Sequence, residues 1–239
     1  MTGTVKLALD GGIATLTLDR VEARNALNEA MCEELLAAAE GIGEPVRVLF
    51  IRGAGPAFCA GADLKERTGK TREWVRARRL KAFAAYRAIE ALPMPVIGVM
   101  HGAVLGAGIE IASICDFLVS TPDAFFGTPE AQRGTVGATQ RLPRIIGKRL
   151  AKDLMFTGRR LTAEEARAAG FVSRIIPAEI LDKEVLEIGK AIAAAPAQAI
   201  RLAKRCIDQG VERDPQGAME VEIAAIDEQL ASGVWMGKE

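Results

Sequence analysis

The sequence predicts an α/β core that extends to about residue 177, followed by a helical C-terminal part over residues 178–239. Two observations favour this division. Short apolar runs typical of strands recur through the first 177 residues, between stretches with helical spacing. After residue 177 only helical spacing recurs, and no linker rich in Ser, Gly or Pro separates the two parts.

The first two strands are predicted to form a hairpin. Val5–Leu9 and Ile13–Leu18 alternate apolar with small or polar residues, and Asp10-Gly11-Gly12 lies between them. An Asp-Gly pair between two runs of period 2 is a strong hairpin signal, because glycine tolerates the left-handed backbone of a tight turn.

A helix and a third strand are predicted next. Asn25–Glu40 carries Leu and Met at helical spacing, and either Asn25 or Asn28 can cap this helix. Val46–Arg52 is a short apolar run typical of a strand. The remaining predicted elements are a strand over Pro95–Met100, helices over Lys148–Thr157 and from a capping box at Thr162 to Gly170, a strand over Phe171–Ile176, and helices over about 178–194, 196–209 and 215–231.

Composition and charge exclude several classes of protein. Of the 239 residues, 49% are hydrophobic and 26% are charged, which is typical of a globular domain. The 31 basic and 31 acidic residues give zero net charge, so charge offers no argument for a nucleic acid or an anionic membrane as partner. No apolar stretch approaches the roughly 18 residues of a membrane span, and no signal peptide is visible. We therefore expect a cytoplasmic protein.

Cysteine and histidine are too scarce for the common kinds of metal site. The four cysteines are far apart, without Cys-x-x-Cys spacing, and His101 is the single histidine. A zinc site would have too few ligands, and no nucleophile motif surrounds His101. We therefore expect no metal site, a structural role for His101, and reduced cysteines packed in the core.

The segment over residues 94–130 carries the strongest functional signal. Glu110 lies in an apolar helical run that follows Gly106-Ala107-Gly108, and Glu130 directly follows Gly127-Thr128-Pro129. A carboxylate in an apolar setting is costly to bury unless it is paired or takes part in chemistry. Two such glutamates suit acid/base chemistry on a neutral carbon centre. Either one alone would more often be a helix residue that faces solvent or is capped by a salt bridge, so the functional interpretation rests on the whole constellation.

Two further segments are candidates for ligand contact. Residues 53–63 are rich in Gly and Ala, so their free N–H groups could donate to an oxyanion, and a tightly packed turn is an equal alternative. Residues 65–87 contain nine Lys/Arg against two Glu, interspersed with Trp74, Phe83 and Tyr86. This basic segment is typical of a solvated helix face, and a cationic rim for a phosphate-bearing ligand is the sharper alternative.

Several motifs, in order along the chain, resemble the crotonase (enoyl-CoA hydratase/isomerase) superfamily. They are Arg24-Asn-Ala-Leu-Asn28, Ala57-Phe-Cys-Ala-Gly-Ala-Asp-Leu64, Pro95-Val-Ile-Gly-Val99, His101-Gly-Ala-Val-Leu-Gly-Ala-Gly-Ile-Glu110, Cys115-Asp116, Phe126-Gly-Thr-Pro-Glu130 and Gln140-Arg-Leu-Pro143. The resemblance implies a spiral of repeated ββα units over residues 1–177 that binds an acyl-CoA. It also implies a C-terminal helical region over 178–239 that assembles homotrimers or dimers of trimers.

The same resemblance implies a reaction, namely hydration of a 2-enoyl-CoA to a 3-hydroxyacyl-CoA. The backbone N–H groups of Ala62 and Ala107 would stabilise a thioester enolate, Glu110 would activate water, and Glu130 would donate a proton to C2. Coenzyme A enters as part of the substrate, and no other cofactor is implied. Further contacts with the substrate or its CoA are implied at Arg24, Ala26, Ala60, Gly61, Asp63, Leu64 and Gly106.

Two departures from the family pattern concern the chain after Glu130. The loop over residues 131–140 is about three residues shorter than is common in hydratases, and the sequence ends at Glu239, where relatives usually continue through another helix. The closest alternative function is a Δ3,Δ2-enoyl-CoA isomerase, which would need mainly Glu130. A more remote alternative is an RNA-binding family member that uses the basic segment 65–87.

Overall fold

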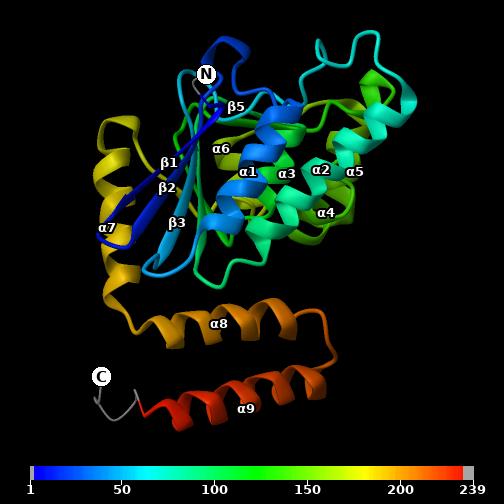
Figure 1. Cartoon of the computed structure of the whole chain (residues 1–239). Coiled ribbons are helices and arrows are strands. Elements are labelled where there is room, and N and C mark those ends of the chain that lie inside the picture. Colours follow the sequence, from blue (N-terminus) through cyan, green and yellow to red (C-terminus); the bar gives the residue numbers. More distant parts are fainter. Residues whose placement is uncertain (1–2, 234–239) are drawn as a thin grey trace.

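The computed structural model describes residues 3–233 and shows an α/β fold built on two sheets (Figure 1). The strands of the larger sheet are β1 (Val5–Asp10), β2 (Ile13–Leu18), β3 (Val48–Gly53), β4 (Val96–Met100), β6 (Phe117–Ser120) and β9 (Arg174–Ile175). They lie in the order β1-β2-β3-β4-β6-β9, and all neighbours are parallel except β1 and β2. The predicted α/β class is confirmed.

The predicted hairpin at the start of the chain is confirmed as well. Asp10 of β1 pairs with Ile13 of β2, so the turn between the two strands consists of Gly11 and Gly12. Both glycines have positive φ, 52° and 83°, a backbone conformation that glycine adopts without a Cβ clash.

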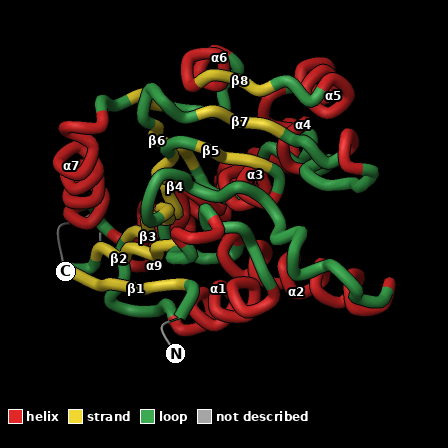
Figure 2. Tube along the Cα trace, turned by 90° about the horizontal axis from the view of Figure 1, so that it is seen from above, coloured by secondary structure: helices red, strands yellow, loops and turns green. Residues whose placement is uncertain are grey.

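A second sheet of three strands lies beside the first and carries the central segment of the sequence (Figure 2). It consists of β5 (Ala103–Leu105), β7 (Phe125–Gly127) and β8 (Arg160–Thr162), in that order. Residues 57–59 run along Gly102 and β5 and pair with them through the bridges Ala57–Gly102 and Cys59–Val104. The Gly/Ala-rich segment is therefore joined to this sheet.

Helices cover both faces of the larger sheet. Against one face lie α1 (Glu29–Gly41), α2 (Arg72–Glu90) and α3 (Ala107–Ser113), while α4 (Arg141–Ile146), α5 (Lys148–Thr157) and α6 (Ala163–Ala168) surround the second sheet. The opposite face is covered by α7 (Leu181–Ala194), whose Ile188 packs with Val48 and Phe50 of β3.

The last two helices form an antiparallel pair at one end of the molecule (Figure 1). They are α8 (Ala197–Gly210) and α9 (Pro215–Ser232). Residues 3–233 also contain three short 3-10 helices, η1 (Val21–Ala23), η2 (Ala131–Arg133) and η3 (Ala178–Ile180). None of the helices within residues 3–233 is long and apolar enough to cross a membrane.

Two predicted elements are longer than the structure shows. Helix α1 begins at Glu29 with Asn28 as its N-cap, because Asn25 has a left-handed backbone (φ 55°) and its buried side chain donates to two loop carbonyls. The strand predicted over Phe171–Ile176 is reduced to β9. The ring of Phe171 packs edge-on against Phe126, so this end of the segment lies in the hydrophobic core and does not pair with a strand.

His101 and the cysteines make structural contacts. The Nε2 atom of His101 lies 2.9 Å from the carbonyl oxygen of Gly55. All four cysteines are free thiols, and Cys32 and Cys59 are buried in the core.

Candidate active site

The chain that follows β4 positions Gly106, Ala107 and Glu110 of the predicted site. Gly102 has a φ of +52°, and a Cβ added there would lie 2.2 Å from the carbonyl oxygen of Pro56, so only glycine allows this turn. β5 and Gly106 follow, and α3 begins at Ala107. This path places Glu110 in the first turn of α3.

Four segments lie side by side across the site. Main-chain hydrogen bonds of 2.8–3.0 Å join residues 24–27 to residues 59–63, and residues 59–63 to residues 103–105. Gly106 in turn donates to the carbonyl of the last residue of β7. Glu130 follows β7 and therefore lies on the flank opposite residues 24–27.

Two backbone N–H groups at this junction are free. Neither Ala62 nor Ala107 donates its N–H to an acceptor within residues 3–233. The two segments that carry them are in close contact, since a Cβ added to Gly106 would lie 3.6 Å from the Cα of Gly61. Free N–H groups that border a cavity are suited to stabilise an oxyanion.

A cavity of about 100 Å³ brings together eight of the eleven predicted site residues. Those eight are Ala60, Gly61, Ala62, Leu64, Gly106, Ala107, Glu110 and Glu130. The other three, Arg24, Ala26 and Asp63, lie outside its lining.

Asp63 and its neighbours make structural contacts outside the cavity. The guanidinium of Arg20 donates to the carbonyl of Ala26 at 2.5 Å and pairs with the Asp63 carboxylate at 3.1 Å. Burial would raise the pKa of Asp63, but the N–H of Glu66 and the Arg20 guanidinium outweigh it and hold this pKa below its ordinary value. The Asp63 carboxylate therefore fixes the turn that follows the Gly/Ala-rich segment.

The carboxylate of Glu110 is held from two sides. Its Oε1 accepts the N–H of Ala138 at 2.7 Å, and its Oε2 lies 3.5 Å from the guanidinium of Arg141. Arg141 is itself held by Glu90 at 2.8 Å. The negative charge of Glu110 is therefore partly compensated within the protein, by a guanidinium that it shares with Glu90.

Glu130, by contrast, is half-buried and lacks a partner at one buried oxygen. Its Oε2 makes no hydrogen bond to any described residue. Burial raises the pKa of Glu130 above its ordinary value of 4.5, and the nearby charge of Glu110 acts in the same direction. The carboxyl group packs against two glycines, because an added Cβ would lie 2.8 Å from Oε1 at Gly106 and 3.1 Å from it at Gly137.

The two carboxyl groups thus share one cavity in different surroundings. A charge-compensated carboxylate is suited to accept a proton, and a buried carboxyl group with a raised pKa is suited to donate one. Together with the two free N–H groups, the arrangement can perform acid/base chemistry next to a carbonyl whose oxygen becomes negative.

The basic segment over residues 65–87 is partly a solvated helix face and partly a lining of the cavity. Arg67, Arg78 and Arg79 line the cavity together with Phe83 and Tyr86 of α2. Arg78 is buried and donates to a main-chain carbonyl, whereas most other cations of the segment are exposed, as on a solvated helix face.

Sequence reasoning missed the residues that hold the loop over 131–140 in place. Arg79 donates to the carbonyl of Val136 at 3.0 Å and to the hydroxyl of Thr135. Arg141 was part of a recognised motif, but nothing in the sequence pairs it with Glu110, which lies 31 residues earlier.

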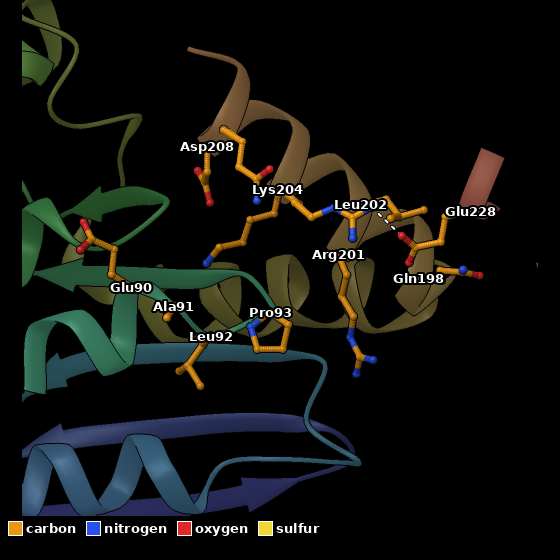
Figure 3. Close-up of a pocket in the computed structure, with 12 residues that line it drawn as sticks. Glu90, Ala91, Leu92, Pro93, Gln198, Arg201, Leu202, Lys204, Asp208 and Glu228 are labelled. Carbon is orange, nitrogen blue, oxygen red and sulfur yellow. Dashed lines mark hydrogen bonds and ion pairs between the residues drawn. The ribbon is translucent and has the colours of Figure 1, made fainter. Parts of the chain in front are cut away.

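A larger cavity, of about 710 Å³, lies between the end of α2 and the α8–α9 pair (Figure 3). Its cations are already engaged: Lys204 pairs with Asp116 at 2.9 Å, and Arg205 pairs with Glu228 at 2.6 Å. These ion pairs connect α8 to the core and to α9. The smaller cavity, with its buried carboxyl group and free N–H groups, is therefore the candidate active site.

Comparison with known proteins finds similarity over almost the whole chain. The family profile described as enoyl-CoA hydratase/isomerase matches residues 9–233. Human enoyl-CoA hydratase domain-containing protein 2, mitochondrial, is 39% identical over 224 residues, which cover 89% of this chain and 76% of the human protein.

Solved structures are similar in fold as well as in sequence. The crystal structure of an enoyl-CoA hydratase from Bacillus anthracis has a TM-score of 0.90 and 35% identity, and the match covers 94% of this chain and 90% of that one. A Thermobifida fusca structure in complex with acetoacetyl-CoA has a TM-score of 0.89 and 27% identity, and the match covers 96% of each chain.

Proposed function

Because the chain belongs to the enoyl-CoA hydratase/isomerase family, we propose that it hydrates a 2-enoyl-CoA thioester to a 3-hydroxyacyl-CoA. The observation that carries this proposal is the presence of Glu110 and Glu130 in one cavity with two free backbone N–H groups. The relative solved with acetoacetyl-CoA supports an acyl-CoA as the ligand.

The N–H groups of Ala62 and Ala107 would bind the thioester oxygen. When water adds to C3 of the conjugated double bond, negative charge moves onto this oxygen. Two preorganised donors stabilise that charge more strongly than they stabilise the neutral carbonyl of the substrate, which lowers the barrier.

The two glutamates would then divide the acid/base work. Glu110 accepts a proton from water as the new C3–O bond forms, and Glu130 gives its proton to C2 as the new C–H bond forms. The surroundings support this assignment, because Glu110 is charge-compensated and burial favours the protonated form of Glu130. Exchange of protons with water between turnovers restores both groups.

Isomerisation of a 3-enoyl-CoA is the second candidate function. It requires only one carboxyl group to move a proton between C4 and C2, and the partnerless oxygen of Glu130 is suited to that role. Hydration remains the better-supported proposal, because a second carboxylate, Glu110, lines the same cavity.

A pair of substrates separates the two functions. We expect the protein to remove the absorbance of the conjugated enoyl thioester from crotonyl-CoA and to form 3-hydroxybutyryl-CoA. With vinylacetyl-CoA, a 3-enoyl-CoA, we expect no gain of that absorbance. Formation of crotonyl-CoA from vinylacetyl-CoA, without hydroxyacyl product from either substrate, would establish the isomerase instead.

RNA binding by the basic segment is the least supported function. Arg78 is buried and Arg79 is bonded to the loop over 131–140, so these two guanidinium groups are engaged within the protein. We expect any binding of nucleic acid to be weak and to disappear as the salt concentration rises.

Cytoplasmic location also stays a prediction.

A further inference from the structure

Three guanidinium groups that line the candidate active site have no carboxylate partner. The side chains of Arg67 and Arg133 make no hydrogen bond or ion pair within residues 3–233. Arg79 donates only to neutral acceptors, the carbonyl of Val136 and the hydroxyl of Thr135. This region of the cavity therefore carries positive charge that the described protein does not neutralise.

The glutamates of the cavity do not supply the missing negative charge. Glu110 already lies beside Arg141, which it shares with Glu90, and burial favours the neutral form of Glu130. The cations of Arg133 and Arg79 are near enough to Glu130 to oppose that effect of burial on its pKa. An anion from outside the protein would compensate these arginines.

The order of the segments indicates which part of the substrate reaches them. Residues 24–27 lie on one flank, the free N–H groups of Ala62 and Ala107 lie in the middle, and the loop held by Arg79 lies on the Glu130 flank. An acyl chain whose thioester oxygen lies at the N–H groups, and which extends through the cavity to the Glu130 flank, reaches Arg79 and Arg133. The cavity, of about 100 Å³, has room for a short acyl chain.

We propose that the preferred substrate is a short 2-enoyl-CoA whose acyl chain ends in a carboxylate. This inference rests on the proposed function and adds the class of acyl group. Arg67, Arg79 and Arg133 would bind the terminal carboxylate and determine specificity, because guanidinium groups form strong charge-assisted hydrogen bonds with carboxylates.

Binding of two saturated thioesters tests the inference without requiring turnover. Glutaryl-CoA carries a terminal carboxylate, and hexanoyl-CoA is its neutral counterpart of similar size. By titration calorimetry we expect the parent protein to bind glutaryl-CoA about 10-fold or more tightly than hexanoyl-CoA, the scale of one or two charge-assisted hydrogen bonds.

Variants identify the arginines that cause this preference for glutaryl-CoA. We expect Arg67→Gln combined with Arg133→Gln to abolish it while the affinity for hexanoyl-CoA stays within about 2-fold. Arg133→Gln alone, at an exposed position, reduces the preference and serves if the double variant does not fold. Arg76→Gln, which removes an exposed α2 cation outside the cavity lining, is the matched control and changes neither affinity.

Two results would overturn the inference. One is equal affinity of the parent for both thioesters. The other is an equal loss for both thioesters in the double variant, which would assign the arginines to the phosphates of CoA. Hydration of crotonyl-CoA without a carboxylate preference would defeat this inference and leave the proposed function intact. If the protein preferred glutaryl-CoA but hydrated neither crotonyl-CoA nor glutaconyl-CoA, the proposed function would be wrong and the inference about the carboxylate would stand.

Discussion

Glu110 and Glu130 differ in their surroundings, and this difference is the basis of the proposed division of roles. Glu110 has a main-chain N–H donor and a nearby guanidinium, while one oxygen of Glu130 has no partner among the described residues. A pair of identical side chains can thereby act as base and acid at the same pH.

Removal of either carboxyl group should slow turnover. We expect Glu110→Gln and Glu130→Gln each to lower kcat for crotonyl-CoA by roughly 100-fold or more, the usual effect of losing a general acid or base. Glu40→Gln, at an exposed position on α1, is the control and should leave kcat unchanged. Parent-like turnover by the double Gln variant would be incompatible with the mechanism.

The raised pKa of Glu130 should also appear in the stability of the protein. Its carboxyl group holds a proton more tightly when folded, so the favourable contribution is complete below pH 4.5 and is lost as the pH rises through the raised pKa. We expect Glu130→Gln and the parent to have similar Tm at about pH 4, and the variant to have the higher Tm at about pH 7.5. A Tm difference independent of pH would contradict this assignment.

At the scale of elements, the site depends on the contact of α3 with the Gly/Ala-rich segment. A Cβ added to Gly108 would lie 2.7 Å from the carbonyl oxygen of Cys59, so α3 can approach this segment only with glycine there. The contact sets the positions of the Ala107 N–H group and of Glu110 relative to Ala62.

Gly108→Ala should therefore displace α3. Because the added methyl group meets backbone, we expect a lower Tm and a loss of kcat of about 10-fold or more, since small displacements of catalytic groups are costly. Gly41→Ala is the matched control at the end of α1, where no atom lies within 4 Å of the added Cβ. Equal kcat and Tm in the two variants would show that this contact does not position the site.

How much the sequence could predict depends on the range of the interactions involved. The hairpin turn and the capping box at Thr162 are local patterns, and both were predicted. Asn25 and Asn28 are equivalent as local caps, and only the buried bonds of Asn25 to a distant loop decide between them. The bond of Glu110 to Ala138, 28 residues away, likewise depends on the closed fold and leaves no local signal.

At the scale of the whole molecule, α9 has an apolar face that no other part of residues 3–233 covers. Met219, Ile223, Ile226 and Leu230 recur at helical spacing and are each about half exposed, while Val221 and Ala225 of the same helix are buried. The expected assembly into a trimer or a dimer of trimers would cover this face.

Charge on that face should prevent assembly. We expect the parent protein to have the mass of a trimer or hexamer of 25.4 kDa chains by light scattering, and Ile223→Asp combined with Ile226→Asp to lower it to one chain. Glu222→Gln, also exposed on α9, should have no effect. An unchanged mass for the double variant would place the interface elsewhere.

The measurement that tests the central claim most directly is turnover of crotonyl-CoA in water labelled with ¹⁸O, with the product analysed by mass. Hydration by the two glutamates predicts a 3-hydroxybutyryl-CoA that carries one labelled oxygen, formed by the parent and strongly reduced in Glu110→Gln and Glu130→Gln. Conversion of crotonyl-CoA to an unlabelled isomer, or labelled product at the same rate from both variants, would contradict it.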